Sequence, residues 1–172
     1  MRGDRILRRF ARRMSRPRRL EGVSYVGYNF YFLTFCTRDR AQVFVEDSPV
    51  YSSLLQFRRT ATLEGFSINA YCFMPDHVHL LVEATRPDSD LKRFAKLAKQ
   101  RAGAAYALSG RGRLWQEGYY ERILRDDDAP RDVARYIIAN PLQAGLVASP
   151  MEYPYAGSDV WTLSHLLDAS IS

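Results

Sequence analysis

Residues 67–83 read SINAYCFMPDHVHLLVE, and this stretch decides the fold. Two runs rich in apolar and aromatic residues, Ser67–Met74 and His77–Glu83, lie on either side of the dipeptide Pro75-Asp76. Proline and aspartate favour a tight turn, so the two runs predict a β-hairpin. Strand side chains alternate between faces, so the second strand should have one apolar core face and one face that carries both of its histidines. The core face holds Val78, Leu80 and Val82, and the opposite face holds His77, His79, Leu81 and Glu83.

Two further strands and three helices are predicted around this hairpin. The aromatic and β-branched run Asn29–Thr37 indicates a strand, and Tyr119–Leu124 indicates another. A 3.6-residue period predicts one helix from Pro49 to about Leu63, capped by Ser48 and ending near Gly65, and another from Asp90 to about Leu108. A third helix should begin at Ala129-Pro130 and be interrupted by Pro141.

The resulting order, β-α-β-β-α-β-α, is typical of an α+β fold. It matches the ferredoxin-like plan, an antiparallel sheet with two crossover helices on one face, followed here by one additional helix. The connections are too short for a second domain. We therefore expect a single folded domain over residues 23–172, preceded by a basic arm over residues 1–22.

The charge of the chain points to a polyanionic partner. The 25 basic residues exceed the 19 acidic ones, which gives a net charge of +6 and a pI near 9.5. Nine arginines lie between residues 2 and 19, a pattern that suits contact with nucleic-acid backbone. Arginine forms paired hydrogen bonds to phosphate and stacks on bases. The candidate DNA-binding residues are Arg8, Arg9, Arg12 and Arg13 in the arm, Lys92, Lys96 and Lys99 on the second helix, and Arg111, Arg113 and Trp115 after it.

Several classes of protein are excluded. No apolar run reaches the roughly 18 residues of a membrane-spanning helix, and the charged N-terminus does not resemble a secretory signal. We therefore expect a cytoplasmic protein without a membrane partner. Cys36 and Cys72 are the only cysteines, so neither a disulfide framework nor a cysteine zinc cluster can form.

The pair His77 and His79 is the first candidate for chemistry. Residues two apart on a strand place their side chains on the same face, about 6 to 7 Å apart at Cα, which suits the binding of one divalent cation. The chain has only three histidines, and two of them lie here.

The third helix carries the second candidate. Tyr136 and Asn140 lie one turn apart on the same helix face. An amide oxygen could complete a metal site begun by the two histidines, and a tyrosine beside that metal would face a phosphate whose charge the metal neutralises. A phenol with a pKa of about 10 needs such help to act as a nucleophile at neutral pH.

Four separated segments together resemble a known family. FMPDHVHLLVE (73–83), LWQEGYYERIL (114–124), ARYIIANPLQAGLV (134–147) and YPYAGSDVW (153–161) occur in the order found in single-tyrosine HUH transposases. The similarity spans roughly residues 23–161 and is greatest to the REP-associated tyrosine transposases and their insertion-sequence relatives. By this resemblance, His77 and His79 match the metal-binding pair, Tyr136 matches the nucleophile, and Asn140 matches the polar residue that helps to hold the metal.

The resemblance implies an HUH nuclease-like fold and a metal-dependent reaction on single-stranded DNA that forms hairpins. The tyrosine attacks the scissile phosphate, leaving a 5′-phosphotyrosine link and a free 3′-hydroxyl, and the reverse step joins a second strand. The metal would be Mg²⁺ or Mn²⁺, no nucleotide cofactor is needed, and the enzyme would be a monomer or a homodimer. Tyr120 and Tyr119 compete with Tyr136 as nucleophile or could, like Trp115, stack unpaired bases.

Two other classes of protein stay open from the residues alone. His77, His79 and Glu83 also fit the start of a cupin metal site, although a cupin barrel needs more strands than the pattern predicts. A non-catalytic module that binds single-stranded nucleic acid would keep the sheet and the basic arm without a metal. A requirement for Mg²⁺ or Mn²⁺ in the nicking of a hairpin separates these alternatives.

Overall fold

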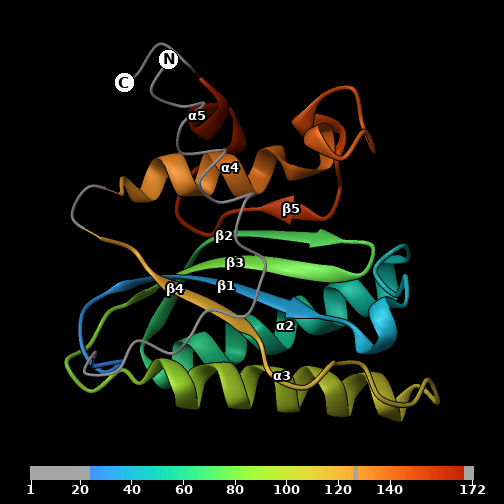
Figure 1. Cartoon of the computed structure of the whole chain (residues 1–172), viewed down its shortest axis with the longest axis horizontal. Coiled ribbons are helices and arrows are strands. Elements are labelled where there is room, and N and C mark those ends of the chain that lie inside the picture. The colour runs from blue at the N-terminus through green and yellow to red at the C-terminus, as the bar shows by residue number, and fades with distance from the viewer. Residues whose placement is uncertain (1–23, 126–127, 169–172) are drawn as a thin grey trace.

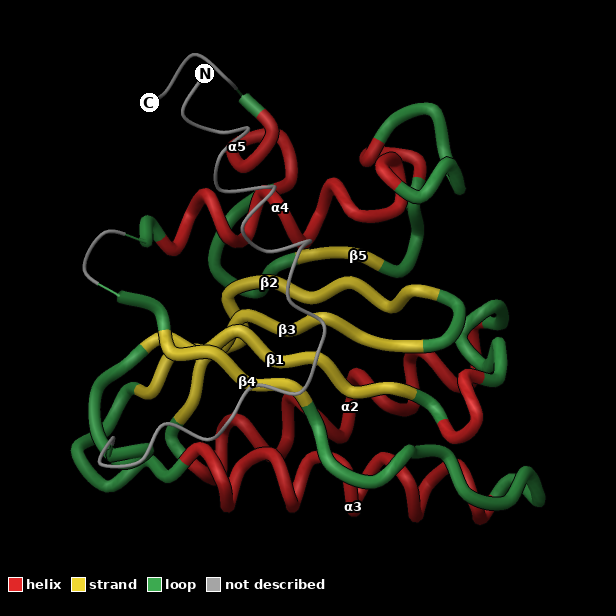
Figure 2. Tube along the Cα trace, in the orientation of Figure 1, coloured by secondary structure: helices red, strands yellow, loops and turns green. Residues whose placement is uncertain are grey.

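The computed structural model describes residues 24–125 and 128–168, whose arrangement is shown in Figures 1 and 2. The predicted basic arm, with Arg8, Arg9, Arg12 and Arg13, lies outside the described residues. The main elements follow the predicted order. They are β1 (Phe30–Cys36), α2 (Asp47–Glu64), β2 (Phe66–Met74), β3 (His77–Ala84), α3 (Leu91–Leu108), β4 (Tyr120–Ile123), α4 (Pro130–Gln143), β5 (Ala156–Gly157) and α5 (Leu163–Leu167).

The described strands form one antiparallel sheet in the order β4-β1-β3-β2-β5. The predicted hairpin is confirmed, since β2 and β3 pair with Met74 opposite His77 across the Pro75-Asp76 turn. Helices α2 and α3 lie side by side on one face of the sheet and α4 covers the other (Figure 1). This arrangement confirms the α+β, ferredoxin-like prediction. The cupin alternative is wrong, because an open sheet between helices is not a barrel.

The face toward α2 and α3 is a large apolar core. Alternate residues of the central strands point into it, and they meet apolar side chains of both helices. The predicted core residues Val78, Leu80 and Val82 are fully buried there. The strands add Tyr31, Leu33, Phe35 and Phe73, and the helices add Leu54, Phe57, Leu91 and Phe94.

The face that carries the histidines is a second core rather than an open surface. Val133 and Ile137 of α4 pack against Phe32 of β1 and Leu81 of β3. The apolar stripe of α4 needs an apolar surface, and the remaining side chains of the strands supply it. The alternation in the sequence predicts core residues on one face only, and the burial of the histidine face corrects that prediction.

Two predicted helix boundaries are also wrong. Helix α2 begins at Asp47, and its N-cap is Glu46 rather than Ser48. Pro49 then lies in the first turn, where its missing N–H would have had no helical acceptor in any case. Helix α4 continues through Pro141 to Gln143. Pro141 lies in the last turn, so the helix loses one hydrogen bond near its end and is not broken.

A short segment near the C-terminus adds an edge strand that the sequence pattern does not predict. Ala156 and Gly157 pair with Cys72 and Tyr71 of β2. A Cβ atom on Gly157 would lie 2.5 Å from the hydroxyl of Tyr71, so this close approach requires glycine. Two residues are too few for a period-2 pattern to reveal a strand.

The structure also bears on the predicted absence of a membrane partner. In the part of the chain that it describes, none of the helices has both the length and the apolar character needed to cross a membrane.

Candidate active site

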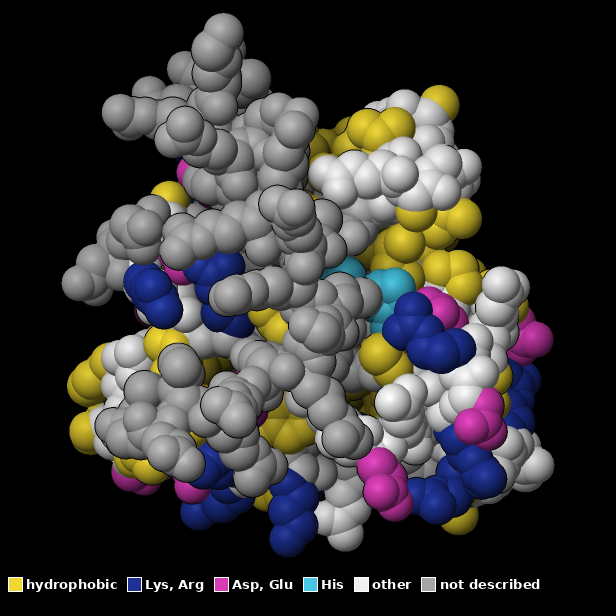
Figure 3. Space-filling model, in the orientation of Figure 1, with side chains coloured by type: hydrophobic (Ala, Val, Ile, Leu, Met, Phe, Trp, Pro, Cys, Tyr) yellow, Lys and Arg dark blue, Asp and Glu magenta, His cyan; other side chains and the backbone are white. Residues whose placement is uncertain are grey.

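The two histidines of β3 meet at their Nε2 atoms. His77 is 9% exposed and His79 is 3% exposed, and their Nε2 atoms lie 3.1 Å apart. On the face seen in Figure 3 the histidines reach the surface at one place, with a basic and an acidic side chain beside them. The predicted pairing of the two imidazoles is therefore confirmed in position.

The other ring nitrogens are held by neighbouring side chains. Nδ1 of His77 donates to Oδ1 of Asp76 at 2.6 Å. In the neutral imidazole, Nε2 of His77 then carries a lone pair and no hydrogen. Nδ1 of His79 lies 2.8 Å from Oγ1 of Thr34, a buried hydroxyl on β1. A hydroxyl can donate or accept. Thr34 therefore suits both tautomers of His79, the one that donates from Nε2 to His77 and the one that turns a lone pair toward an ion.

Both histidines are neutral at physiological pH. Burial lowers the pKa of His77, although the hydrogen bond to Asp76 opposes this effect. Burial, the neighbouring His77 and the guanidinium of Arg40 hold the pKa of His79 well below its ordinary value. Neutral imidazole is the form that binds metal ions.

This donor set fits a divalent ion. Two ligand nitrogens about 2.1 Å from one ion and at right angles to each other lie about 3 Å apart, close to the observed separation. Within residues 24–125 and 128–168, no group of three or more His, Cys, Asp or Glu side chains is placed to hold a metal. A third protein ligand from the described residues would have to be of another type, such as the predicted amide of Asn140.

Tyr136 lies on the same side of the sheet as the histidines. It is 7% exposed, and its ring packs against Phe32 with the centroids 6.4 Å apart. Phe32 in turn stacks on His79 at 5.3 Å. Burial raises the pKa of Tyr136, Asn140 opposes this rise through a side-chain hydrogen bond, and Tyr120 adds to it. The phenol is therefore protonated before any reaction.

Asn140 is bound to its own helix. Its Nδ2 donates to the carbonyl oxygen of Tyr136 at 2.8 Å, one turn earlier. The predicted shared face of the two residues is confirmed, and this hydrogen bond fixes the amide beside the tyrosine.

The competing tyrosines lie on opposite faces of the sheet. Tyr120 packs edge-on against Phe32, on the histidine side, with the centroids 6.0 Å apart. Tyr119 packs against Phe35 in the core toward α2 and α3. This placement leaves Tyr120 as the alternative nucleophile near the histidines.

Sequence reasoning missed Arg40, which lies in the turn Arg38-Asp39-Arg40 directly after β1. Nε of Arg40 pairs with Oδ2 of Asp76 at 2.8 Å, and Nη1 donates to Sγ of Cys36 at 2.9 Å. Asp39 and Arg40 both have left-handed backbone, with φ of 54° and 56°. Left-handed backbone at a residue other than glycine is uncommon and is found preferentially at functional sites.

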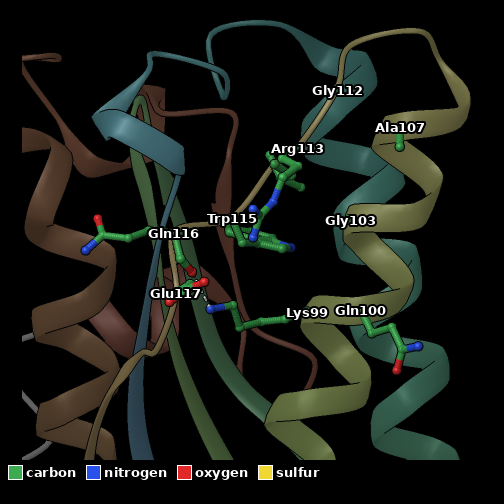
Figure 4. A pocket seen from close by; sticks show the side chains of 10 residues that line it. Lys99, Gln100, Gly103, Ala107, Gly112, Arg113, Trp115, Gln116 and Glu117 are labelled. Atoms are coloured by element: carbon green, nitrogen blue, oxygen red, sulfur yellow. Dashed lines mark hydrogen bonds between the residues drawn. The ribbon is translucent and has the colours of Figure 1, made fainter.

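The predicted DNA-binding residues of α3 lie across the sheet from the histidines. Lys92 and Lys96 are exposed. Lys99 instead reaches from α3 toward the following loop (Figure 4). Its Nζ donates to the backbone carbonyl oxygens of Gln116, at 2.8 Å, and of Gly118. Burial lowers the pKa of Lys99. Lys99 therefore holds this loop against α3.

The loop residues are divided between core and surface. Trp115 is 8% exposed and packs against Phe35, Phe44 and Phe57, so most of its ring belongs to the core. Arg111, exposed like Arg113, pairs with Glu46 at 3.0 Å. The space of about 350 Å³ between this loop and α3 is lined by Lys99, Gln100, Gly103, Ala107, Gly112, Arg113, Leu114, Trp115, Gln116 and Glu117 (Figure 4).

Comparison with known proteins gives a consistent result. The sequence profile of the family described as "Transposase IS200 like" matches residues 27–140, more than half of the chain. The REP-associated tyrosine transposase of Escherichia coli K12 is 28% identical over 138 residues, which cover 77% of this chain and 78% of the relative. A Haemophilus influenzae protein provisionally named a REP-associated tyrosine transposase is 27% identical over 140 residues, covering 73% of this chain and 77% of the relative.

A solved structure agrees at the level of the fold. It is described as a REP-associated tyrosine transposase bound to a REP hairpin, and it superposes with a TM-score of 0.67 at 23% identity, covering 83% of this chain and 82% of the other. The family profile covers the histidine pair, Tyr136 and Asn140. The chain therefore belongs to the IS200-like transposase family, and the relatives that it resembles there are REP-associated tyrosine transposases.

Proposed function

We propose that this protein cleaves and rejoins single-stranded DNA at a hairpin, with Tyr136 as nucleophile and a divalent ion, Mg²⁺ or Mn²⁺, held by His77 and His79. The observation that carries the proposal is the convergence of the two Nε2 atoms, 3.1 Å apart, on the sheet face where Tyr136 packs. A buried pair of neutral imidazoles facing each other suits an ion, and a tyrosine beside them suits attack on a phosphate that the ion contacts.

In the proposed step, the phenolic oxygen of Tyr136 forms a bond to the scissile phosphorus, and the bond from phosphorus to the 3′-oxygen breaks. Tyr136 loses one proton and the 3′-oxygen takes up one, so the products are a 5′-phosphotyrosine and a free 3′-hydroxyl. Attack by another 3′-hydroxyl reverses the step and joins two strands. The number of phosphodiester bonds is unchanged, so no nucleotide cofactor is required.

The side chains of the site have distinct roles in this reaction. A bound ion would neutralise charge on the scissile phosphate. Asp76 and Thr34 orient the two imidazoles through their Nδ1 atoms. Asn140, fixed beside Tyr136, would add an amide oxygen to the ion. The ring of Phe32 contacts the rings of both Tyr136 and His79.

The proposed substrate follows from the relatives and from the charge. The matching solved structure is described as bound to a REP hairpin. A chain with a net charge of +6 suits a nucleic-acid partner, and the exposed Lys92, Lys96, Arg111 and Arg113 can contact phosphate. The basic arm over residues 1–22 is proposed to add phosphate contacts, with base discrimination left to the folded domain over residues 23–172.

The test is the formation of a covalent adduct with a labelled hairpin that carries a short single-stranded foot. The full-length protein is incubated with the hairpin and with Mn²⁺, Mg²⁺ or excess chelator, and the products are separated on a denaturing gel. We expect a protein–DNA adduct and a released strand with a 3′-hydroxyl in either metal, and neither product in chelator. Cleavage of equal rate in chelator would rule out the metal-dependent mechanism.

The same experiment separates the non-catalytic alternative. A module that only binds nucleic acid would retard the hairpin on a native gel and give no adduct in any metal. A scrambled sequence of equal length is the control for specificity, and it should give less adduct than the hairpin at the same protein concentration.

A further inference from the structure

The guanidinium of Arg40 lies on the same face of the sheet as the histidine pair. Cys36 and His77 are directly opposite each other on β1 and β3, so their side chains are close neighbours on one face. Nη1 of Arg40 contacts Sγ of Cys36, and Nε contacts Asp76, which in turn holds His77. The positive charge of Arg40 is felt by both imidazoles. The guanidinium therefore lies on the histidine face, where the carboxylate of Asp76 connects it to Nδ1 of His77.

Part of this guanidinium is unused. The side chain is 46% exposed, and Nη2 has no hydrogen-bond partner among the described residues. Arginine presents several N–H groups in one plane, and the side that faces away from Asp76 can donate to an oxygen of a phosphate. A purely structural ion pair would not require an open donor edge next to the histidines.

The backbone that carries Arg40 is held firmly. The buried Thr37 anchors this turn at two points. Its N–H donates to the carbonyl oxygen of Asp76 at 3.0 Å, and its Oγ1 donates to the carbonyl oxygen of Ala41 at 2.8 Å. The turn from Arg38 to Ala41 is thereby fixed to the turn that precedes the histidines. Two consecutive left-handed residues, Asp39 and Arg40, persist only where the surroundings determine them in this way.

We propose that Arg40 is a catalytic residue, whose Nη2 and remaining Nη1 hydrogen donate to a non-bridging oxygen of the scissile phosphate. This inference rests on the proposed DNA cleavage by Tyr136. Negative charge on the non-bridging oxygens must be stabilised during attack, and a preorganised guanidinium on the histidine face would supply this on one of them. Neither the sequence pattern nor the family resemblance assigns a role to this residue.

The first experiment compares Arg40→Gly with Arg38→Ala in the full-length protein. Glycine removes the guanidinium and retains the left-handed backbone, and Arg38 is a matched control because it lies in the same turn and pairs only with Asp39 among the described residues. We expect Arg40→Gly to slow single-turnover formation of the adduct by about 100-fold to 1,000-fold, with hairpin affinity within about threefold of wild type. Arg38→Ala should retain the wild-type rate.

A second measurement separates contact with the phosphate from an indirect effect through Asp76. If Arg40 acted only by orienting Asp76 and His77, Arg40→Gly would weaken Mn²⁺ binding in calorimetry and would have no further effect in an Asp76→Asn background. We expect Mn²⁺ to bind Arg40→Gly at least as tightly as wild type, because a nearby positive charge is lost. The full loss of rate should remain in the Asp76→Asn background.

The third measurement uses hairpins whose scissile phosphate is replaced by one or the other methylphosphonate diastereomer. One diastereomer lacks the oxygen that Arg40 contacts, and on it wild type and Arg40→Gly should form adduct at the same rate. A wild-type advantage of about 100-fold on both diastereomers would overturn the contact. An Arg40→Gly variant that cleaves the natural hairpin as fast as wild type overturns this inference alone, whereas a wild-type protein that forms no adduct overturns the proposed function as well.

Discussion

On the α2 and α3 side of the sheet, the central strands bury apolar and aromatic side chains, and the buried polar residues Ser53, Thr60 and Glu64 belong to α2. On the α4 side, the strands themselves bury His77, His79 and Thr34 next to Tyr136. Helices lie over both sides, α2 and α3 over one and α4 over the other (Figure 1). Covering polar groups is favourable only when each finds a partner. The three polar residues beside Tyr136 find partners in one another and in Asp76.

This difference indicates a division of roles between the two faces. Apolar burial on the α2 and α3 side supplies stability in proportion to area and requires no particular geometry of donors. The α4 side keeps fixed directions for two imidazoles and one phenol in a place with little water, where electrostatic interactions with a substrate are stronger. Substitutions on the two faces should therefore be distinguishable by what they reduce, stability or chemistry.

The largest effect is expected for Tyr136→Phe. Only one hydroxyl is lost and the ring still packs on Phe32, so folding and hairpin binding should stay near wild type while the covalent adduct disappears. The measurement is the adduct band on a denaturing gel, with a native gel for binding. Tyr120→Phe is the matched control on the same face. An adduct that persists in Tyr136→Phe and is absent in Tyr120→Phe would move the nucleophile to Tyr120.

The next largest effect is expected for His79→Ala, compared with Leu81→Ala on the same strand and face. Loss of a ligand should reduce adduct formation and Mn²⁺ affinity by about 100-fold or more. Even the loss of a residue that only hydrogen-bonds to a metal ligand typically lowers metal affinity or activity by about 10-fold to 100-fold. Leu81→Ala should cost about 2 to 5 kcal/mol of stability and leave Mn²⁺ affinity unchanged. Equal Mn²⁺ affinities in the two variants would mean that this face does not bind metal through His79.

Trp115→Ala tests the opposite face. The ring is buried among three phenylalanines, so its removal should lower the free energy of unfolding by about 3 to 5 kcal/mol. At a temperature where the variant stays folded, its adduct rate and hairpin affinity should match wild type. A normal stability combined with a loss of hairpin affinity would restore the sequence-based role of Trp115 in stacking on bases.

A smaller effect is expected for Lys99→Met compared with Lys96→Met. Lys99→Met removes two hydrogen bonds to loop carbonyls, which corresponds to about 1 to 2 kcal/mol of unfolding free energy by chemical denaturation. Lys96→Met should change stability by less than about 0.5 kcal/mol, because its side chain is exposed. Identical stabilities would show that the contacts of Lys99 do not hold the loop.

The sequence predicted the parts of this molecule that depend on local pattern. The alternation around His77 and His79 gave the hairpin and its faces, and the spacing of Tyr136 and Asn140 gave their common side of α4. These relations involve residues within a few positions of each other, where backbone geometry alone fixes direction.

Roles that depend on distant contacts could not be predicted in the same way. Trp115 and Lys99 have the residue types of a nucleic-acid contact, and only the packing of their loop against β1 and α3 shows where their side chains go. The role of Arg40 could not be predicted for the same reason. Its proximity to His77 arises from the pairing of β1 with β3 and from a left-handed turn, and neither can be inferred from the residue types.

The hydroxyl of Thr34 has a consequence for how an ion would be taken up. With both imidazoles neutral, the hydrogen of His79 need only move from Nε2 to Nδ1, and the rotation of one hydroxyl accommodates the change. No proton has to leave the protein. The calorimetric enthalpy of Mn²⁺ binding near pH 7 should therefore be the same in buffers of different ionisation heat. The ion-free protein should also remain folded.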